Sequence, residues 1–306
     1  MDSSTQLKLQ LREASEAEIA SRIREHQVSV GRIKAGTKRR RLQGLAPREP
    51  QLDLLAIGDS WFEYPLNDEG LWVPFWNAAV VGATQLQSMG NPPPLINSIA
   101  MHGQSMTAIM GLENQKRMRD LLENNNAWLN EDTGLPDAIL VSGGGDDIAG
   151  DQFVIYLESL GGGLSPRFQD VLDLVEASYN DLFAFRDEFA PKVRIFGHCY
   201  DYALPNGHGT IFGGPWLRPS LDFAGYNFAE DLGIVQAAID RFYAMLQGLS
   251  GDPANLFTLV DTRQTLTRDT SQPLGWANEL HPYFAGFSAV AGKFLVALQN
   301  EFPGRI

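Results

Sequence analysis

Short apolar segments recur along most of the chain, and each ends in small or polar residues. Segments of this kind are typical of buried parallel strands, although their pattern alone does not distinguish them from buried helix segments. Stretches with helical spacing separate them. The expected strands cover residues 52–58, 95–101, 137–143, 192–198 and 256–261, and the expected helices cover about 105–129, 167–190, 227–249 and 284–301.

The alternation of strand and helix predicts the fold class. Parallel strands need crossover connections, and these connections are right-handed and place helices on both faces of the sheet. We therefore predict an α/β protein with a parallel sheet between two helical layers. Ligands in such sheets bind beyond the carboxyl ends of the strands. Candidate chemistry is therefore expected just after residues 58, 101, 143, 198 and 261.

The first 50 residues differ in character from the rest. Residues 13–26 are rich in strong helix formers, whereas residues 31–50 are basic and interrupted by Gly and Pro, which suggests a linker. We predict an N-terminal helical and basic extension with its linker over residues 1–50, and a catalytic domain over residues 51–306. The extension is expected to be dispensable for catalysis, because every candidate catalytic residue follows it.

Charge is distributed unevenly between these two parts. Residues 1–50 carry 11 Lys and Arg against 6 Asp and Glu, which leaves 13 basic and 31 acidic residues, a balance of −18, in the remainder. Such an acidic body argues against a nucleic-acid partner, because phosphate binding needs clustered cations. The basic run from Lys38 to Arg41 suits either an anionic-lipid or nucleic-acid patch, or a solvated arm that docks on the acidic body or tethers a partner subunit. We favour the solvated arm.

The sequence also bears on compartment and covalent links. No run of about 18 apolar residues is present, so no stable membrane insertion is expected. The N-terminus lacks the apolar stretch of a secretory signal, and we expect a cytoplasmic protein whose oligomeric state is left open. Cys199 is the single cysteine, which excludes an internal disulfide and a cysteine metal cluster.

Two connections are too long for simple turns, and both are rich in aromatic residues. Long aromatic loops at the ligand end of a sheet form an apolar pocket or lid, or else pack as a minor core, and the two interpretations are compatible. The connection over 61–94 holds Trp61, Phe62, Tyr64, Trp72, Phe75 and Trp76, and the connection over 199–226 holds Tyr200, Tyr202, Phe212, Trp216, Phe223 and Tyr226.

The first candidate motif, Gly58-Asp59-Ser60, ends the first expected strand. A serine at a strand-to-helix turn lies where N–H groups at a helix N-terminus stabilise developing negative charge. A triplet of this kind is more often only a turn, so the motif carries little weight alone.

The second motif, Gly143-Gly144-Gly145-Asp146-Asp147, ends the third expected strand. Its glycines would let the backbone approach a ligand closely. The motif lacks the Lys-Ser/Thr ending of a phosphate-binding loop, and its two aspartates would repel phosphate. A metal site on these aspartates lacks a second ligand cluster nearby, so no metal is expected.

The third motif is Asn278-Glu279-Leu280-His281-Pro282, just before the last expected helix. Histidine has a pKa near neutrality, so His281 suits a general base that takes a proton from a serine hydroxyl and returns it to a leaving group. The remaining histidines are interpreted as structural; they are His26, His102, His198 and His208.

Together these motifs make residues 52–300 resemble the SGNH (GDSL-type) serine hydrolases, whose four sequence blocks supply Ser, Gly, Asn and His. Ser60, Gly103 within His102-Gly103-Gln104, Asp146 and His281 fall in the four blocks in the family's order. The resemblance implies a three-layer α/β/α sandwich of the flavodoxin-like type, with five parallel strands in the order 2-1-3-4-5. It also implies Ser60 as nucleophile, and Ser60, Gly103 and position 146 as the oxyanion hole.

Two positions depart from the family pattern. Asp146 stands where the family has an asparagine whose amide donates to the oxyanion, so it is protonated, turned away or a change that weakens the enzyme; one lost donor typically costs about 10²–10³ in rate. Asn278 stands where the family usually has the aspartate that orients the histidine, and an amide supplies no charge to the imidazolium. Asp201, Asp261 and Glu279 are other carboxylates for this role, and a Ser-His dyad supported by a backbone carbonyl is equally consistent.

The leading interpretation is a serine esterase that acts on a small-molecule or lipid-like ester through an acyl-enzyme on Ser60. His281 is its general base, no cofactor is implied, and the rate is expected to rise with pH through about 6–8. One alternative is a lipase or lysophospholipase that works at membrane surfaces. Another is a catalytically weakened fold that binds an ester or a carbohydrate without turnover, for which Asp146 and Asn278 are the arguments.

Overall fold

The apolar segments form one parallel sheet in the computed structural model, which describes residues 3–46, 51–64, 81–159, 161–209 and 213–306. The strand order is β2-β1-β3-β4-β5, which confirms the predicted topology. Every residue of β1 and β3 is buried, as expected for strands covered on both faces. The strands are β1 (Asp53–Gly58), β2 (Leu95–Ser98), β3 (Ala138–Ser142), β4 (Arg194–His198) and β5 (Phe257–Val260).

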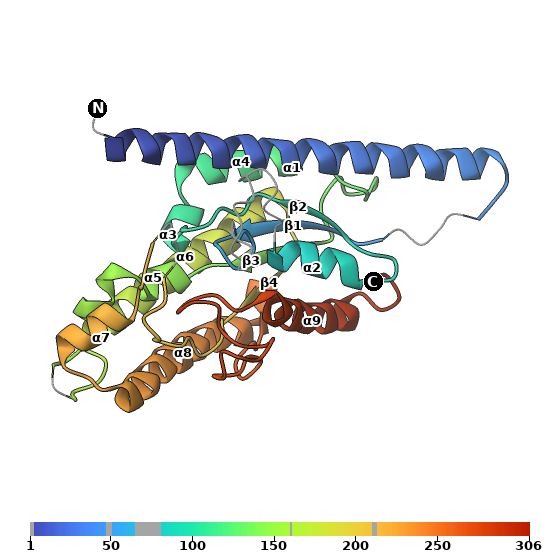
Figure 1. The fold of residues 1–306 in the computed structure, drawn as a ribbon. Helices are drawn as coiled ribbons and strands as arrows, with labels where there is room; N and C mark the ends of the chain where they lie inside the picture. The colour runs from blue at the N-terminus through green and yellow to red at the C-terminus, as the bar shows by residue number, and fades with distance from the viewer. Residues whose placement is uncertain (1–2, 47–50, 65–80, 160, 210–212) are drawn as a thin grey trace.

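Helices cover both faces of the sheet, which gives the expected three-layer α/β/α sandwich (Figure 1). Right-handed crossovers place the β1–β2 connection on one face and the later connections on the other. Accordingly, α2 packs against α9, and α6 packs against α8. The helices are α1 (Ser3–Leu42), α2 (Val81–Met89), α3 (Met106–Ile109), α4 (Leu112–Leu122), α5 (Gly145–Ile148), α6 (Arg167–Phe189), α7 (Arg218–Ala224), α8 (Phe228–Gly251) and α9 (Phe284–Glu301), with short 3₁₀ helices η2 (Asp151–Tyr156) and η3 (Pro253–Asn255).

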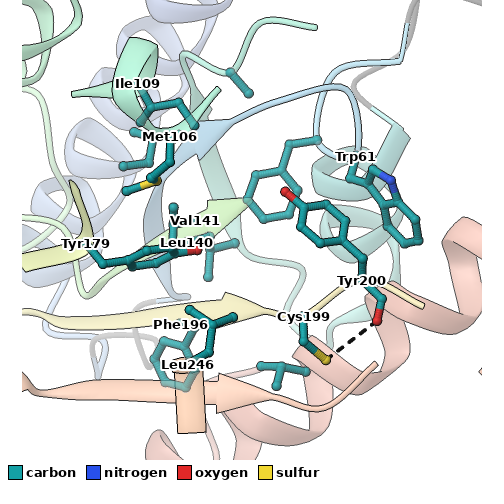
Figure 2. Close-up of a cluster of buried hydrophobic side chains, with 14 of the residues drawn as sticks. Trp61, Met106, Ile109, Leu140, Val141, Tyr179, Phe196, Cys199, Tyr200 and Leu246 are labelled. Atoms are coloured by element: carbon teal, nitrogen blue, oxygen red, sulfur yellow. Dashed lines mark hydrogen bonds between the residues drawn. The ribbon is translucent and has the colours of Figure 1, made fainter. Parts of the chain in front are cut away.

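The helix expected over 105–129 is two helices, α3 and α4. Ser105 caps the first, since its side chain accepts a hydrogen bond from the Ala108 N–H, and Gly111 is the extended N-cap of the second. The break turns α3 onto the sheet. Figure 2 shows its side chains Met106 and Ile109 above Val141 of β3, in the hydrophobic core.

The prediction of a linker from residue 31 is wrong for residues 31–42, because α1 is one continuous helix as far as Leu42. Gly31 and Gly36 each weaken a helix interior by about 1 kcal/mol relative to alanine, which tertiary contacts offset. The helix lies along β2 (Figure 1), and Ile19 and Val30 are buried there. Arginines at its C-terminal end also complement the helix dipole.

Candidate active site

Two distant residues meet above the carboxyl end of the sheet. The Ser60 hydroxyl lies 2.7 Å from Nε2 of His281, although 221 residues separate them. Ser60 is the second residue after β1, and His281 lies in the loop before α9. Ser60 is 9% exposed and His281 6%, so the pair meets largely away from solvent.

Gly58 gives the turn that carries Ser60 its shape. Its φ is +151°, and a Cβ at this position would lie 2.5 Å from the Ser142 carbonyl oxygen. The next residue, Asp59, donates its N–H to that same oxygen over 2.9 Å. Only glycine lets the end of β1 approach β3 so closely, and the turn then directs Ser60 away from the sheet.

Asn278 fixes the orientation of His281. Its side-chain carbonyl oxygen lies 3.0 Å from Nδ1 of the imidazole, and an amide oxygen can only accept, so Nδ1 carries the proton. Nε2 therefore offers a lone pair to the Ser60 hydroxyl. Asn278 is itself held, because its amide donates to the Tyr64 hydroxyl over 2.8 Å, and the Tyr64 ring stacks on His281 with centroids 4.3 Å apart.

The other candidate carboxylates bond elsewhere. Asp201 accepts from the N–H groups of Tyr202, Gln264, Thr265 and Leu266 over 2.7–2.8 Å. Asp261 pairs with Arg263 at 2.9 Å. Glu279 is buried and accepts four backbone N–H groups, those of Gly207, Trp216, Leu217 and Arg218. Asp201 and Glu279 thus secure loops around the site, and the amide of Asn278 is the group that faces His281.

Burial also determines the charge of His281. Loss of hydration, with a smaller contribution from His102, lowers the pKa of His281 to about 3. The imidazole is therefore neutral at ordinary pH and able to accept a proton. This replaces the expected titration at 6–8, which assumed an imidazole with the usual hydration.

Three carboxyl groups, those of Asp59, Asp146 and Asp147, lie close enough together to interact. Burial raises the pKa of Asp146 well above its usual range, and the charges of Asp59 and Asp147 raise it further. Burial likewise raises the pKa of Asp59 to about 6. Asp147 accepts the Met106 N–H over 2.6 Å, whereas no described residue hydrogen-bonds the Asp146 carboxyl. Asp146 is thus favoured in its neutral form, which has an O–H to donate.

The glycine run before Asp146 serves packing. A Cβ on Gly143 would lie 2.6 Å from the Met106 sulfur, one on Gly144 2.6 Å from the Phe242 ring, and one on Gly145 2.7 Å from the Tyr200 ring. The chain after β3 is therefore enclosed by protein side chains, which accounts for the three glycines without a bound ligand.

A pocket adjoins the Ser60–His281 pair. Five titratable side chains line it: Asp59, Asp146, Tyr200, Asp201 and His281. No Lys or Arg in the described part of the chain lines it. The rest of its wall is mainly apolar: Trp61, Ile148, Ala149, Phe153, Ala203, Leu217, Val235, Ala238, Ile239, Trp276 and Leu280.

Only part of the aromatic prediction can be placed. Trp61 and Tyr200 line the pocket, and Trp61 also packs edge-on against Tyr200, Trp276 and Phe287, so it serves both pocket and core. Phe223 is exposed. Four of the predicted aromatic residues, Trp72, Phe75, Trp76 and Phe212, lie outside the described residues.

Gly103 lies in the exposed turn after β2 with φ of +73°, a conformation that favours glycine. Just before it, Met101 donates its N–H to the Gly58 carbonyl oxygen over 2.9 Å, which ties this turn to the one that carries Ser60. Among the residues described, no group of three or more His, Cys, Asp or Glu is arranged to hold a metal ion, and no helix is both long and apolar enough to cross a membrane.

Solved structures share this fold, although no protein-family model and no curated protein matches the sequence. The lipase Lip_vut3 from a goat rumen metagenome aligns with a TM-score of 0.50 at 16% identity, covering 80% of this chain and 97% of that one. A putative GDSL-like lipase from Parabacteroides merdae aligns with a TM-score of 0.43 at 16% identity, covering 81% of this chain and 96% of that one. A mutant of Axe2, an acetyl-xylooligosaccharide esterase from Geobacillus, aligns with a TM-score of 0.45 at 16% identity, covering 81% of this chain and 94% of that one.

The chain has the SGNH hydrolase fold. The candidate residues Ser60, Gly103, Asp146 and His281 lie after β1, after β2, after β3 and in the loop before α9, respectively. At identities of 13–16%, the likeness shows the fold alone.

Sequence reasoning missed several hydrogen-bonding side chains around this candidate site. Asp59 accepts the Ser142 hydroxyl over 2.6 Å and the Tyr200 hydroxyl, and Tyr200 in turn accepts the Gly145 N–H over 3.0 Å. Nε2 of His198 lies 2.9 Å from the Ser142 oxygen. Because the Ser142 O–H already donates its hydrogen bond to Asp59, the histidine N–H is the donor to Ser142. Tyr200 was expected among the aromatic residues of a pocket or lid, but nothing in the sequence indicated its hydrogen bonds or a role for Ser142.

Tyr200 also carries unusual backbone geometry. Its φ is +61°, in the left-handed region that non-glycine residues enter at a cost of about 1–3 kcal/mol. Its hydroxyl bridges the turn after β1 and the turn after β3, and its ring packs on His198 with centroids 4.5 Å apart. The network therefore fixes Gly145 and, next to it, Asp146 relative to Ser60.

Proposed function

We propose that this protein is a serine esterase that hydrolyses neutral esters with an apolar acyl group. One observation carries the proposal: the Ser60 hydroxyl lies 2.7 Å from a neutral His281 whose other nitrogen is held by Asn278, beside an apolar pocket. Each part has a chemical role. A hydroxyl is a weak nucleophile until a neighbouring base takes its proton, and a fixed imidazole is suited to do so.

The reaction begins when the Ser60 oxygen attacks the ester carbonyl and its proton moves to Nε2 of His281. The resulting tetrahedral oxyanion accepts the N–H groups of Ser60 and Gly103, and the O–H of a neutral Asp146 as a third donor. Collapse of this intermediate expels the alcohol, which takes the proton from His281 and leaves an acyl-enzyme. Water, deprotonated by His281, then attacks the acyl carbonyl, and the same steps release the acid and regenerate Ser60.

Asn278 supports these steps differently from an aspartate. When His281 becomes an imidazolium, the amide oxygen keeps accepting the Nδ1 proton but adds no negative charge. The missing negative charge is offset by rigid positioning of the imidazole. The Tyr64 ring stacks on His281, and Tyr64 also accepts a hydrogen bond from Asn278. We propose that the site relies on this fixed geometry more than on a charged third member.

The pocket supports the choice of substrate. Its wall is mostly apolar, and its titratable groups are three carboxyls, a tyrosine and a histidine. An anionic acyl group would lose its hydration in this pocket without meeting a described Lys or Arg, whereas an aliphatic or aryl group gains from burial, at about 25 cal/mol per Å². The direct test is hydrolysis of a p-nitrophenyl ester series from acetate to decanoate by the wild type and by Ser60→Ala. Turnover that is equal in the two proteins, or absent from both, contradicts the proposed function.

Ala238→Phe is expected to shorten the preferred acyl chain. Ala238 lies on α8, is buried and lines the pocket, so a phenyl ring there occupies space that a longer acyl group would use. We expect kcat/KM to fall roughly 10-fold or more for octanoate and by less than about threefold for acetate, since a lost methylene contact is worth about 1–3 kcal/mol.

The adjacent Ala237 is exposed and provides the matched control, because Ala237→Phe adds the same ring on the solvent side of α8. If Ala238→Phe folds and its chain-length profile equals that of Ala237→Phe, the acyl group does not occupy this pocket.

A further inference from the structure

One basic side chain of α1 reaches the segments that carry the proposed active site. The Arg22 guanidinium donates through one terminal nitrogen to the Ala100 carbonyl oxygen over 2.9 Å, and through the other it pairs with Glu63. Both partners are remote in sequence, 78 and 41 residues away. Arg22 is 15% exposed and Glu63 5%, so this contact lies mostly away from solvent.

The two partners belong to the two turns on which catalysis would depend. Glu63 follows Ser60 by three residues, and its N–H donates to the Asp59 carbonyl oxygen over 3.1 Å, which closes the turn of the nucleophile. Ala100 precedes Gly103 by three residues in the segment after β2. Arg22 therefore bridges the segment with the candidate oxyanion donor and the segment with the candidate nucleophile.

We infer that Arg22 is a positioning residue of the hydrolase, through which α1 sets the spacing between the Ser60 turn and the Gly103 turn. The inference rests on the proposed function, because spacing matters only if an oxyanion forms between these turns. A displacement of about 1 Å between reacting groups is enough to lower a rate by about 10²-fold, so a contact outside the pocket acts on turnover without touching the substrate.

The chemistry of the guanidinium suits this task. Its planar fork presents two terminal nitrogens in fixed geometry, so one side chain holds a carbonyl oxygen and a carboxylate together, which the single ammonium of lysine does not reproduce. Burial lowers the pKa of Arg22 to about 10, which leaves it charged at neutral pH. Its neighbour His102 is affected as well, since burial and then the Arg22 charge lower the pKa of that imidazole.

α1 is anchored firmly enough to act as a fixed support. One turn further along, Nε2 of His26 lies 2.6 Å from the buried Asp53 carboxylate in β1, and the second oxygen of Asp53 accepts the Leu129 N–H over 2.7 Å. Ile19 is buried on the same side of the helix. Arg22 thus lies between two buried contacts, and its side chain is presented to the turns from a helix that is held against the sheet.

The test compares Arg22→Met, which removes both bonds, with Arg22→Lys, which keeps the charge without the fork. The control is Arg12→Met on the same helix, where Arg12 pairs with Glu113 and both side chains are exposed, at 60% and 69%. For a p-nitrophenyl ester we expect Arg22→Met to lower kcat about 10- to 100-fold with KM within about twofold, and Arg22→Lys to recover only part of it. Arg12→Met should match the wild type.

A merely structural Arg22 would give a different result. In that case the melting temperature of Arg22→Met falls while kcat per folded molecule stays at the wild-type value, and this outcome overturns the inference. Glu63→Gln, which keeps the shape and removes the charge, provides a second variant if Arg22→Met does not fold, and it is expected to lower kcat in the same direction.

Failure of the proposed function is recognised separately, since a folded wild type would then hydrolyse no more ester than Ser60→Ala. Amide hydrogen exchange over residues 99–104 still decides the role of Arg22 in that event. Faster exchange in Arg22→Met than in Arg12→Met supports a fixed turn, and equal exchange contradicts it.

Discussion

Replacing His281 with alanine is expected to lower kcat by about 10⁴- to 10⁶-fold for an activated ester, in line with the loss of the base from other serine hydrolases. The imidazole is the one basic group within hydrogen-bonding distance of the Ser60 hydroxyl in the described part of the chain. Without it, the hydroxyl keeps its proton and the alcohol leaves unprotonated. The measurement is single-turnover release of p-nitrophenol by His281→Ala.

His208→Ala is the matched control, because His208 is an exposed imidazole of the same chain. It should retain the wild-type rate. Near wild-type turnover in a folded His281→Ala protein would show that another group takes the serine proton.

The pH dependence of the wild type follows from the same residue. The base form of His281 is the neutral one, and its pKa is lowered to about 3, so that form is present at every pH above about 4. The titration of His281 is therefore expected to add no rising limb to kcat/KM at any pH above 5. A rising limb centred between 6 and 8, which the sequence alone suggested, would show that His281 keeps an ordinary hydration shell.

Asp146→Asn is expected to raise kcat at alkaline pH by up to about 10²–10³-fold. The pKa of Asp146 is raised by burial and by its acidic neighbours, so the wild type has a neutral O–H donor below that pKa. As pH rises through it, the donor is lost and a negative charge forms beside the developing oxyanion. Asparagine donates at every pH and carries no charge, so the ratio of the two kcat values should be near one at acid pH and climb with pH.

The comparison needs kcat for both proteins from pH 5 to 9.5 with one activated ester. Asp151→Asn, which changes an exposed carboxylate in η2, controls for a general effect of charge. If Asp146→Asn folds and the ratio stays at one across this range, Asp146 does not face the oxyanion and the third sequence block is misaligned.

Much of the fold could be predicted because local pattern and topology rules agree. The strands begin and end within three residues of their expected bounds, and the sheet order follows from the family resemblance. Ser60 and His281 could be placed together because both follow strand ends or precede a helix at one edge of the sheet. The geometry also brings Asn278 to His281 as an amide partner, which is one of the partners that the family resemblance left open.

What sequence did not reveal depends on contacts between distant segments. The bonds that join Asp59 to Tyr200 and Ser142 span 141 and 83 residues, and no periodicity in the sequence encodes them. Glu279 was considered as a catalytic carboxylate, yet four backbone N–H groups from another loop occupy it. Helix α1 also continues past Gly31 and Gly36, because tertiary packing offsets their low helix propensity, and local propensity alone does not predict this.

The expected dispensability of residues 1–50 needs revision for the same reason. It rested on the absence of candidate catalytic residues from that segment, and the segment still contains none of them. Arg22 and His26, however, bond to Ala100 and Asp53 of the body. Removing α1 would expose Ile19's apolar neighbours and leave the Asp53 and Glu63 carboxylates without these partners, so we now expect such a chain to lose both stability and turnover.

The central claim is that Ser60 forms a covalent intermediate, and reaction with a fluorophosphonate tests it most directly. The folded wild type is incubated with the probe, and peptide mass spectrometry then locates the adduct. We expect one adduct per chain on Ser60, none in Ser60→Ala and a much slower reaction in His281→Ala. An adduct on any other residue, or no adduct on a folded wild type, would contradict the assignment of Ser60 as the nucleophile.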